Sequence, residues 1–243
     1  MELIIEFIII SVLVLFQSVF GIGLLLFGTP IFLIIGYGFE STLALLLPVS
    51  ICISALQIID QKSSIKFLSV SEYNLFCLPF LLLSLVIAIN LGDKVDIKIY
   101  VSVLLIISSI VILNKNRIIF NNKYLLKYRK LYLILIGSIH GFTNMGGGFL
   151  SLFATLVNGD DRVLTRNYIS YGYLIMGIIQ YTTILVIGLN IIDFTNWYYV
   201  CLPLILFYPA QKIFNKIDNQ QFTKIINYIA LIFGIFALSL CLQ

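Results

Sequence analysis

Charged side chains are scarce in this chain. Asp, Glu, Lys and Arg together make up only 11% of its 243 residues, whereas soluble domains carry about 25%. Hydrophobic residues account for 60% of the positions, and the mean hydropathy is +1.07. One core cannot hide that much apolar surface, so lipid must be the solvent for most side chains. The composition predicts a polytopic integral membrane protein.

Patterns typical of catalytic or metal sites are also missing. The only histidine is His140, and the sequence contains no HExxH, GxSxG or P-loop pattern. Ser138 lies two positions from His140, so the two cannot face each other on one helix. We therefore expect no enzyme activity, no catalytic residues, no bound metal and no cofactor. The four cysteines lie in apolar runs without a CxxC pair, and we interpret them as buried structural thiols: Cys52, Cys77, Cys201 and Cys241.

Acidic residues are absent from the middle of the apolar segments. Glu6, Asp60, Glu72 and Asp193 all lie near segment ends. A membrane carrier of metal cations normally keeps a buried carboxylate. The absence therefore favours an anionic or neutral substrate.

The apolar segments predict an all-α membrane fold, because about 20 apolar residues span a bilayer as a helix. Plain helices are expected over 42–59, 72–91, 97–113, 168–188, 196–210 and 222–242. Two other apolar stretches, 3–35 and 131–157, are interrupted by glycines. We expect each to be a helical hairpin broken at its glycines, with a long glycine-kinked helix as the alternative.

The chain repeats itself weakly at an offset of 123 residues. Phe20–Gly23 then aligns with Thr143–Gly146, and three plain helices follow each broken segment in the same order. We interpret this as a duplication. It divides the chain into a first membrane repeat over 1–113, a basic cytoplasmic linker over 114–130 and a second membrane repeat over 131–243.

The distribution of basic residues indicates that the two repeats are inverted. Loops that face the cytoplasm collect Lys and Arg, and 114–130 carries six of them with no acid. If each broken segment returns to the side it entered, 13 of the 15 basic residues lie inside, leaving only Lys94 and Lys98 outside. Topology alone explains the linker, so we expect contact with membrane lipid but not with nucleic acid.

The broken segments are the candidate substrate site. A glycine turn exposes backbone N–H groups at the start of a helix, whose positive end attracts an anion. We place the substrate between the two turns, near mid-membrane. The expected ligands are the backbone of Gly21, Gly23, Gly146, Gly147 and Gly148 and the side chains of Gln17, Gln57, Thr143, His140, Asn144 and Gln180.

Structural roles compete with several of these assignments. His140 either contacts the anion or carries a coupling proton, or it is a packing histidine. Gln57 and Gln180 align at the repeat offset and either line a cavity or join helices.

Two further patterns have structural interpretations. Gly137 and Gly141 form a GxxxG, which we assign to helix packing. On that basis we expect Gly137→Ala to be milder than Gly147→Leu. Arg162 and Arg166, beside two aspartates, are interpreted as a salt-bridged cytoplasmic loop, with an anion gate as the alternative.

The glycine runs resemble those of a known family. Phe20-Gly21-Ile22-Gly23-Leu24-Leu25-Leu26 with Pro30 resembles the first motif of the TauE/SafE family of carriers, and the run from His140 to Leu150 resembles the second. The sequence departs from the family pattern in both motifs. Leu24 and Leu25 take the place of glycines in the first motif, and in the second motif Phe153 takes the place of the proline that would match Pro30.

The resemblance implies a secondary transporter of a bacterial inner membrane. Its cargo would be a small sulfur-containing anion such as sulfite or an organosulfonate, moved by alternating access between the two repeats. A membrane-embedded scaffold that transports nothing is the alternative, and a homo-oligomer is left open.

The inverted topology predicts where reporter domains will be found. Fusions at Gln243 should report a non-cytoplasmic location and fusions at Asn122 a cytoplasmic one, because this arrangement puts the basic residues inside. A cytoplasmic signal at Gln243 would instead make the two repeats parallel.

Overall fold

The computed structural model describes residues 2–60, 67–91, 127–158, 161–187 and 198–218, with the separate residues 100, 103, 106, 107, 221, 225 and 228. Over these residues the protein is helical and contains no strand. The elements are α1 (Glu2–Phe20), α2 (Leu24–Ile35), α3 (Phe39–Asp60), α4 (Phe67–Phe76), α5 (Leu78–Leu91), α9 (Arg129–Thr143), α10 (Gly147–Asn158), α11 (Arg162–Ile187) and α12 (Cys201–Lys216).

Most of the expected helices are found, with changed limits. The helix expected over 168–188 begins already at Arg162, and the one expected over 196–210 starts at Cys201 after a 3-10 turn over 198–200. Arg129 and Lys130, assigned to the linker, belong to α9. The segments 97–113 and 222–242 and the linker over 114–126 lie largely or wholly outside the described residues.

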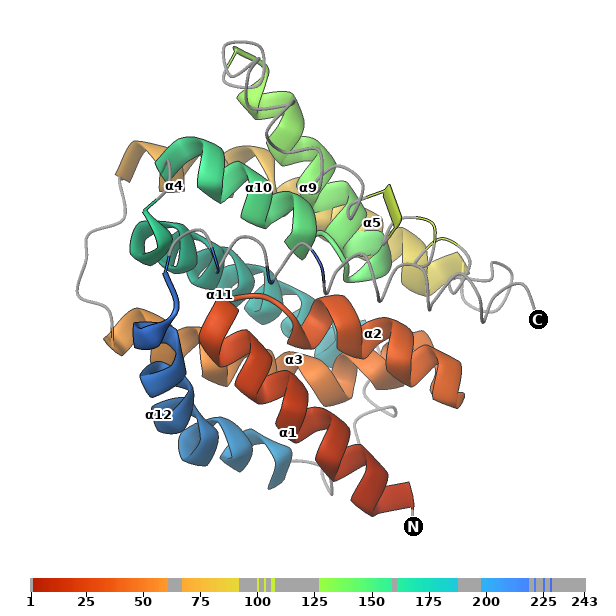
Figure 1. Cartoon of the computed structure of the whole chain (residues 1–243). Coiled ribbons are helices and arrows are strands. Elements are labelled where there is room, and N and C mark those ends of the chain that lie inside the picture. The colour runs from red at the N-terminus through yellow and green to blue at the C-terminus, as the bar shows by residue number, and fades with distance from the viewer. Residues whose placement is uncertain are drawn as a thin grey trace.

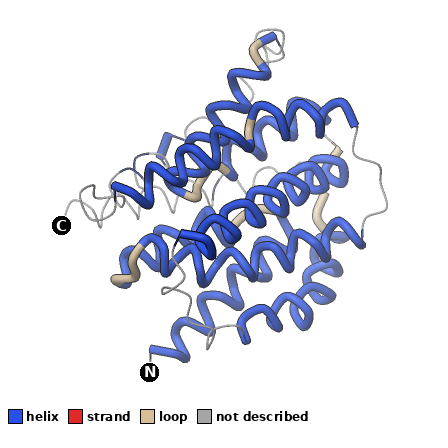
Figure 2. Tube along the Cα trace, turned by 180° about the vertical axis from the view of Figure 1, so that it is seen from behind, coloured by secondary structure: helices blue, strands red, loops and turns tan. Residues whose placement is uncertain are grey.

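The helices pack around a central pair. α3 and α11 lie in the middle, with α1 and α12 on one side and α5 and α9 on the other (Figure 1). The view from behind shows the same order (Figure 2). Four helical stretches are long and apolar enough to cross a membrane: Leu3–Phe20, Phe39–Asp60, Val70–Leu91 and Arg162–Ile187.

The outer faces of these helices are strongly apolar. Val186 is 79% exposed, Ile205 67% and Leu204 63%. Such surfaces are stable against lipid and costly against water. Of the cysteines, Cys77 is buried as expected, but Cys201 is exposed on the apolar outside of α12.

The first broken segment is a helical hairpin. Leu13 of α1 lies beside Gly28 of α2, and the rings of Phe16 and Phe27 are 5.4 Å apart. Residue numbers fall along α1 as they rise along α2, so the two helices are antiparallel.

The second broken segment folds back in the same way. Tyr132 of α9 donates a hydrogen bond to the Phe149 carbonyl of α10, and its ring stacks on Phe153. His140, nearer the turn, contacts Gly146. These contacts confirm the hairpin and exclude a single kinked helix for both segments.

Five helix ends agree with the offset of 123 residues. α1 ends at Phe20 and α9 at Thr143; α2 spans Leu24–Ile35 and α10 spans Gly147–Asn158. The starts of α3 and α11, and of α5 and α12, match in the same way: Phe39 with Arg162 and Leu78 with Cys201.

Matching helices run in opposite directions. The central helices α3 and α11 are antiparallel, because Gln57 bonds to Ser170 while Ile51 lies beside Gly177. α1 runs parallel to α12, since Glu6 contacts Tyr199 and Ser18 contacts Gln211.

α9 is likewise parallel to α5, since Cys77 lies beside Gly137 and Leu81 beside Gly141. Three helices therefore run in one direction, namely α1, α3 and α12. Three run in the opposite direction, namely α5, α9 and α11.

The described basic residues gather at one end of the bundle. They lie at the starts of α9 and α11 and at the end of α12, and all three ends point the same way. The opposite end, where α1 and α3 begin, carries Glu2, Glu6 and Glu40. This distribution agrees with the predicted orientation, which stays a prediction because no membrane is part of the structure.

Each hairpin turn lies near one end of one central helix and near the middle of the other, so the expected mid-membrane position stays a prediction. Gln57 bonds to the end of α1 and lies 18 residues from the start of α3 at Phe39, which is roughly 27 Å of helix. Gln180 bonds to α9 and lies equally far from Arg162 in α11.

The GxxxG of α9 is a packing motif, as expected. A Cβ on Gly137 would lie 2.1 Å from the Cys77 carbonyl oxygen, and one on Gly141 2.2 Å from that of Leu81. The two backbones of α5 and α9 therefore touch, which only glycine allows. Gly137→Ala is therefore not a neutral change, and its expected milder effect than that of Gly147→Leu stays a prediction.

We expect Gly137→Ala to destabilise the protein by about 1–3 kcal/mol, because the new methyl group must push α9 away from the α5 backbone. Thermal unfolding of the purified protein in detergent measures this. Gly38→Ala is the matched control, since a Cβ there has no neighbour closer than 3.9 Å. Equal unfolding temperatures for the two variants would contradict the close contact.

Candidate substrate-binding site

The first turn is shaped by two glycines. Gly21 and Gly23 have φ angles of 78° and 135°, which residues with a side chain rarely adopt. The Gly21 N–H donates to the Gln17 carbonyl at 2.7 Å. A Cβ on Gly23 would lie 2.3 Å from the Phe16 ring. The backbone path therefore accounts for both glycines, and their predicted role in binding stays a prediction.

The two glutamine side chains at the first turn form several hydrogen bonds, whereas Ser18 Oγ has no partner among the described residues. Gln17 Nε2 donates to Ser50 Oγ at 3.0 Å. Gln57 Nε2 donates to the carbonyls of Gln17 and Ser18 at 2.8 and 3.1 Å, while its Oε1 accepts from Ser170 Oγ at 2.8 Å. These contacts join α1, α3 and α11. They favour the helix-joining role of Gln57 over the cavity-lining role.

Arg166 does not lie in a cytoplasmic loop, so that interpretation is wrong. It is fully buried within the first turns of α11. Its guanidinium donates to the Ser18 carbonyl at 3.2 Å and to Gln211 Oε1 at 2.8 Å, and lies 4.0 Å from Asp60. Asp161 does not pair with it as expected, but accepts hydrogen bonds from the first N–H groups of α11.

The second turn has the same backbone geometry with different side chains. Asn144 takes the place of Gly21, with a φ of 61°, and its N–H donates to the His140 carbonyl at 2.7 Å. Asparagine tolerates this left-handed conformation better than most residues. Asn144 Nδ2 also donates to Thr29 Oγ1 of α2 at 3.0 Å, so the second turn contacts the first hairpin.

The imidazole of His140 is oriented by the turn itself. Gly146 N–H donates to its Nδ1 at 3.1 Å. Because Nδ1 accepts this bond, the neutral ring carries its proton on Nε2. A coupling proton on Nδ1 would have to break the bond to Gly146, so the geometry favours a neutral donor over a proton carrier.

Four buried polar atoms at the second turn have no hydrogen-bond partner among the described residues. They are His140 Nε2, Asn144 Oδ1, Tyr173 OH and Gln180 Oε1. The imidazole and the Gln180 amide interact, but without a hydrogen bond of normal geometry. Buried polar atoms normally find partners, so this cluster, which we call the open cluster, has unused bonding capacity.

The glycines of the second turn make room for the open cluster. A Cβ on Gly147 would lie 1.6 Å from the Tyr173 hydroxyl, so that hydroxyl sits directly against the start of α10. Gly148 and Thr143 are less central, since the Gly148 carbonyl accepts from Ser151 and Thr143 Oγ1 bonds to the Ile139 carbonyl. The sequence gave no reason to select Tyr173, which is one of 14 tyrosines.

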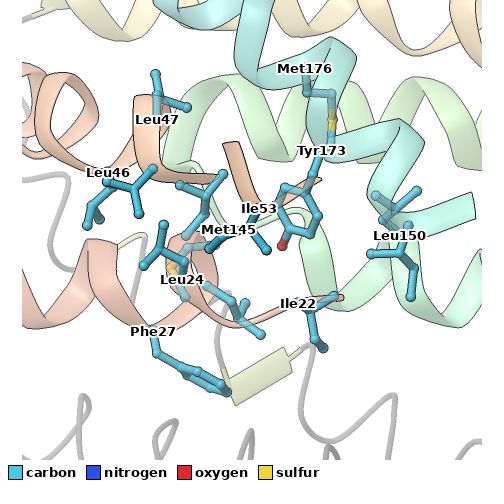
Figure 3. Close-up of a cluster of buried hydrophobic side chains, with 14 of the residues drawn as sticks. Ile22, Leu24, Phe27, Leu46, Leu47, Ile53, Met145, Leu150, Tyr173 and Met176 are labelled. Atoms are coloured by element: carbon cyan, nitrogen blue, oxygen red, sulfur yellow. The ribbon is translucent and has the colours of Figure 1, made fainter. Parts of the chain in front are cut away.

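The predicted site residues do not form one central group. Given the contacts of α3 with α11, the two turns are about ten residues, or roughly 15 Å, apart along the helix axes. Apolar side chains of both turns and of α3 surround the tyrosine of the open cluster: Figure 3 shows Ile22, Leu24, Ile53 and Met145 around Tyr173, all fully buried. The polar groups of the two turns thus form two separate hydrogen-bonding clusters, although Tyr173 lies only three residues from Ser170, which bonds to Gln57.

Comparison with known proteins identifies one family. The model of the family "Sulfite exporter TauE/SafE" matches residues 6–237, which is nearly the whole chain. Searches among curated proteins and among solved structures found no match.

Gln57 and Gln180, which match at the repeat offset, should differ in how much they contribute to stability. Gln57→Leu removes bonds to two backbone carbonyls and to Ser170, which should cost about 1–3 kcal/mol. Gln180→Leu loses only one long bond of 3.5 Å to the His140 carbonyl and removes an unpartnered oxygen. Thermal unfolding of both variants tests this, and an equal loss would show that Gln180 is a structural residue too.

Proposed function

The chain belongs to the sulfite exporter TauE/SafE family, and we propose that it is a secondary transporter of a small anion, sulfite or an organosulfonate. Members of this family are transporters and not enzymes, and the apolar helices make this chain a membrane protein. The proposal further places it as a multi-pass protein in a bacterial inner membrane, with alternating access between its two halves.

The open cluster is the observation that carries the proposal. His140 Nε2–H and the Tyr173 hydroxyl can donate to oxyanion oxygens, while Asn144 Oδ1 and Gln180 Oε1 can accept from an O–H group. A hydrogensulfite ion, or a sulfonate with one water, offers both kinds of partner. Each unsatisfied buried group costs about 1–3 kcal/mol, so a ligand that pairs them binds favourably.

The surroundings of the open cluster favour an anion over a cation. Within the described residues, no group of three or more His, Cys, Asp and Glu side chains could hold a metal ion. The start of α10 adds the positive end of a helix next to Tyr173. Hydrogen bonds from charged or dipolar donors to an anion are stronger than those between neutral groups.

Two inverted halves are the second part of the proposal. Helix ends that agree at one offset, and matching helices that run in opposite directions, support a twofold axis lying in the membrane plane. Carriers with this symmetry expose a site to the two sides in turn by exchanging the conformations of their halves. The apolar side chains around Tyr173 then form part of the barrier that closes one side.

A scaffold without transport is the weaker candidate. A purely structural turn would be expected to satisfy its polar groups, as the first turn does with Gln17 and Gln57. The open cluster in the matching place of the second half leaves polar atoms unpaired instead, which a scaffold gains nothing from.

We expect Tyr173→Phe to reduce anion transport at least about tenfold, because it removes one hydrogen bond to a charged ligand. The unfolding temperature should stay equal or rise, since the hydroxyl is unpartnered in the free protein. Uptake into liposomes should be followed in parallel for sulfite, sulfate, methanesulfonate and a divalent metal ion.

Tyr171→Phe is the matched control. Its hydroxyl lies two residues away on α11 and bonds to Asn74 at 2.9 Å, so this variant should lose stability and keep transport. Movement of the metal without any of the anions would overturn the proposal, and so would full transport in Tyr173→Phe.

A further inference from the structure

A cavity of about 440 Å³ opens at the basic end of the bundle, beside the first turn. It lies between the end of α3, the start of α11 and the end of α12. Its polar lining consists of Asp60, Arg166, Gln211, Lys212 and Asn215. Two cationic side chains face one carboxylate here, so the cavity has an excess of positive charge.

Arg166 forms the buried wall of this cavity. Its guanidinium stacks on the Phe214 ring at 3.6 Å, and its Cγ lies 3.0 Å from where a Cβ of Gly21 would be. The side chain thus separates the cavity from the first glycine turn. Its bond to the Ser18 carbonyl also gives it a structural role at the end of α1.

The Asp60 carboxylate is only loosely held. It lies 4.0 Å from the nearest Arg166 nitrogen, and its side chain is 49% exposed. A pair of this geometry in contact with solvent contributes little. An anion that enters the cavity can therefore replace Asp60 beside the arginine without a large loss of energy.

The charges of the cavity have no counterpart in the other half. At the repeat offset, the residues that match Arg166, Gln211 and Lys212 are apolar: Leu43, Ala88 and Ile89. In the other half the matching Leu43 is fully buried in the hydrophobic core. The polar lining is thus a feature of one end of the protein only.

We propose that this cavity is an anion-binding vestibule, in which the transported oxyanion or sulfonate binds Lys212 and Arg166 in place of the Asp60 carboxylate. The exposed ring of Tyr208 gives the organic part of a sulfonate an apolar surface. This inference rests on the proposed function and adds a second binding place, remote from the open cluster, to the same pathway.

Opposite charge changes should have opposite effects. Lys212→Gln should weaken the binding of sulfite and methanesulfonate about fivefold, and Asp60→Asn should strengthen it by a similar factor. Calorimetric titration of purified protein in lipid-free detergent at constant ionic strength measures both. Lys216→Gln is the matched control, because it removes the same charge one turn further along α12 and does not line the cavity.

Three outcomes overturn the vestibule. The first is unchanged affinity in both Lys212→Gln and Asp60→Asn. The second is an equal shift in Lys216→Gln, which would reduce the effect to bulk charge. The third is that free anions do not bind in detergent, whereas phosphatidylglycerol binds in nanodiscs and its affinity changes with these substitutions. The cavity would then hold a lipid headgroup.

The experiments can contradict the vestibule without contradicting the proposed function, and the reverse. Tyr173→Phe should keep anion binding at the cavity while it loses transport, because the open cluster lies in the other half. Anion transport by the unaltered protein without binding at the cavity would remove only the vestibule. Binding at the cavity without transport of any anion would remove the proposed function.

Discussion

The structure depends on the need to satisfy backbone groups where a helix ends inside an apolar environment. α1 stops at Phe20, and its last residues are buried inside the protein, where water cannot bond their carbonyls. The protein covers them with side chains from three other helices: Gln57 of α3, Arg166 of α11 and Gln211 of α12 all donate to the Ser18 carbonyl. One carbonyl thus fixes where four helices meet. A cation is also favoured there by the negative end of the α1 dipole. The break in the helix, the buried arginine and the packing of the central helices are consequences of the same requirement.

The second half meets the same requirement with fewer bonds, and the proposed substrate site depends on this difference. Gln180 matches Gln57 and also donates to a backbone carbonyl, that of His140, but at 3.5 Å rather than 2.8 Å. His140 replaces Gln17 and Tyr173 replaces Ser50 at the repeat offset. In the first half the matching pair is joined by a hydrogen bond, whereas the larger rings of the second half meet edge to face at 5.7 Å. Polar atoms remain unpaired as a result. A duplicated fold can keep one copy of a site for stability and release the other for ligand binding.

Features set by local sequence could be predicted, and features set by packing could not. Glycine runs within apolar stretches and the offset of 123 correctly indicated the broken hairpins, and the GxxxG correctly indicated a helix contact. Arg166 looked like a surface residue because acids precede it in the sequence, whereas its partners come from helices distant in the chain. Tyr173 has no local signature at all, since its role comes from the missing side chain of Gly147.

The ends of α1 and α9 are about 15 Å apart along the helix axes, and apolar side chains surround the open cluster near the second turn. On the proposed function, an anion passes these side chains only when they separate on one side of the protein at a time. Antiparallel central helices permit such a rearrangement by a small relative rotation. If the halves exchange conformations, the opposite end opens onto Leu43 and Ala88 rather than Arg166 and Gln211. On the proposed function and vestibule, the two faces of the protein then differ in their affinity for anions although the two halves match in their helices. Such a difference in affinity does not set the direction of net transport. The concentration gradients of the transported ions set it, because binding preferences do not change the equilibrium between the two sides of the membrane. The difference in affinity sets instead the concentration at which each side saturates, so the charged face is suited to the side on which the anion is scarce.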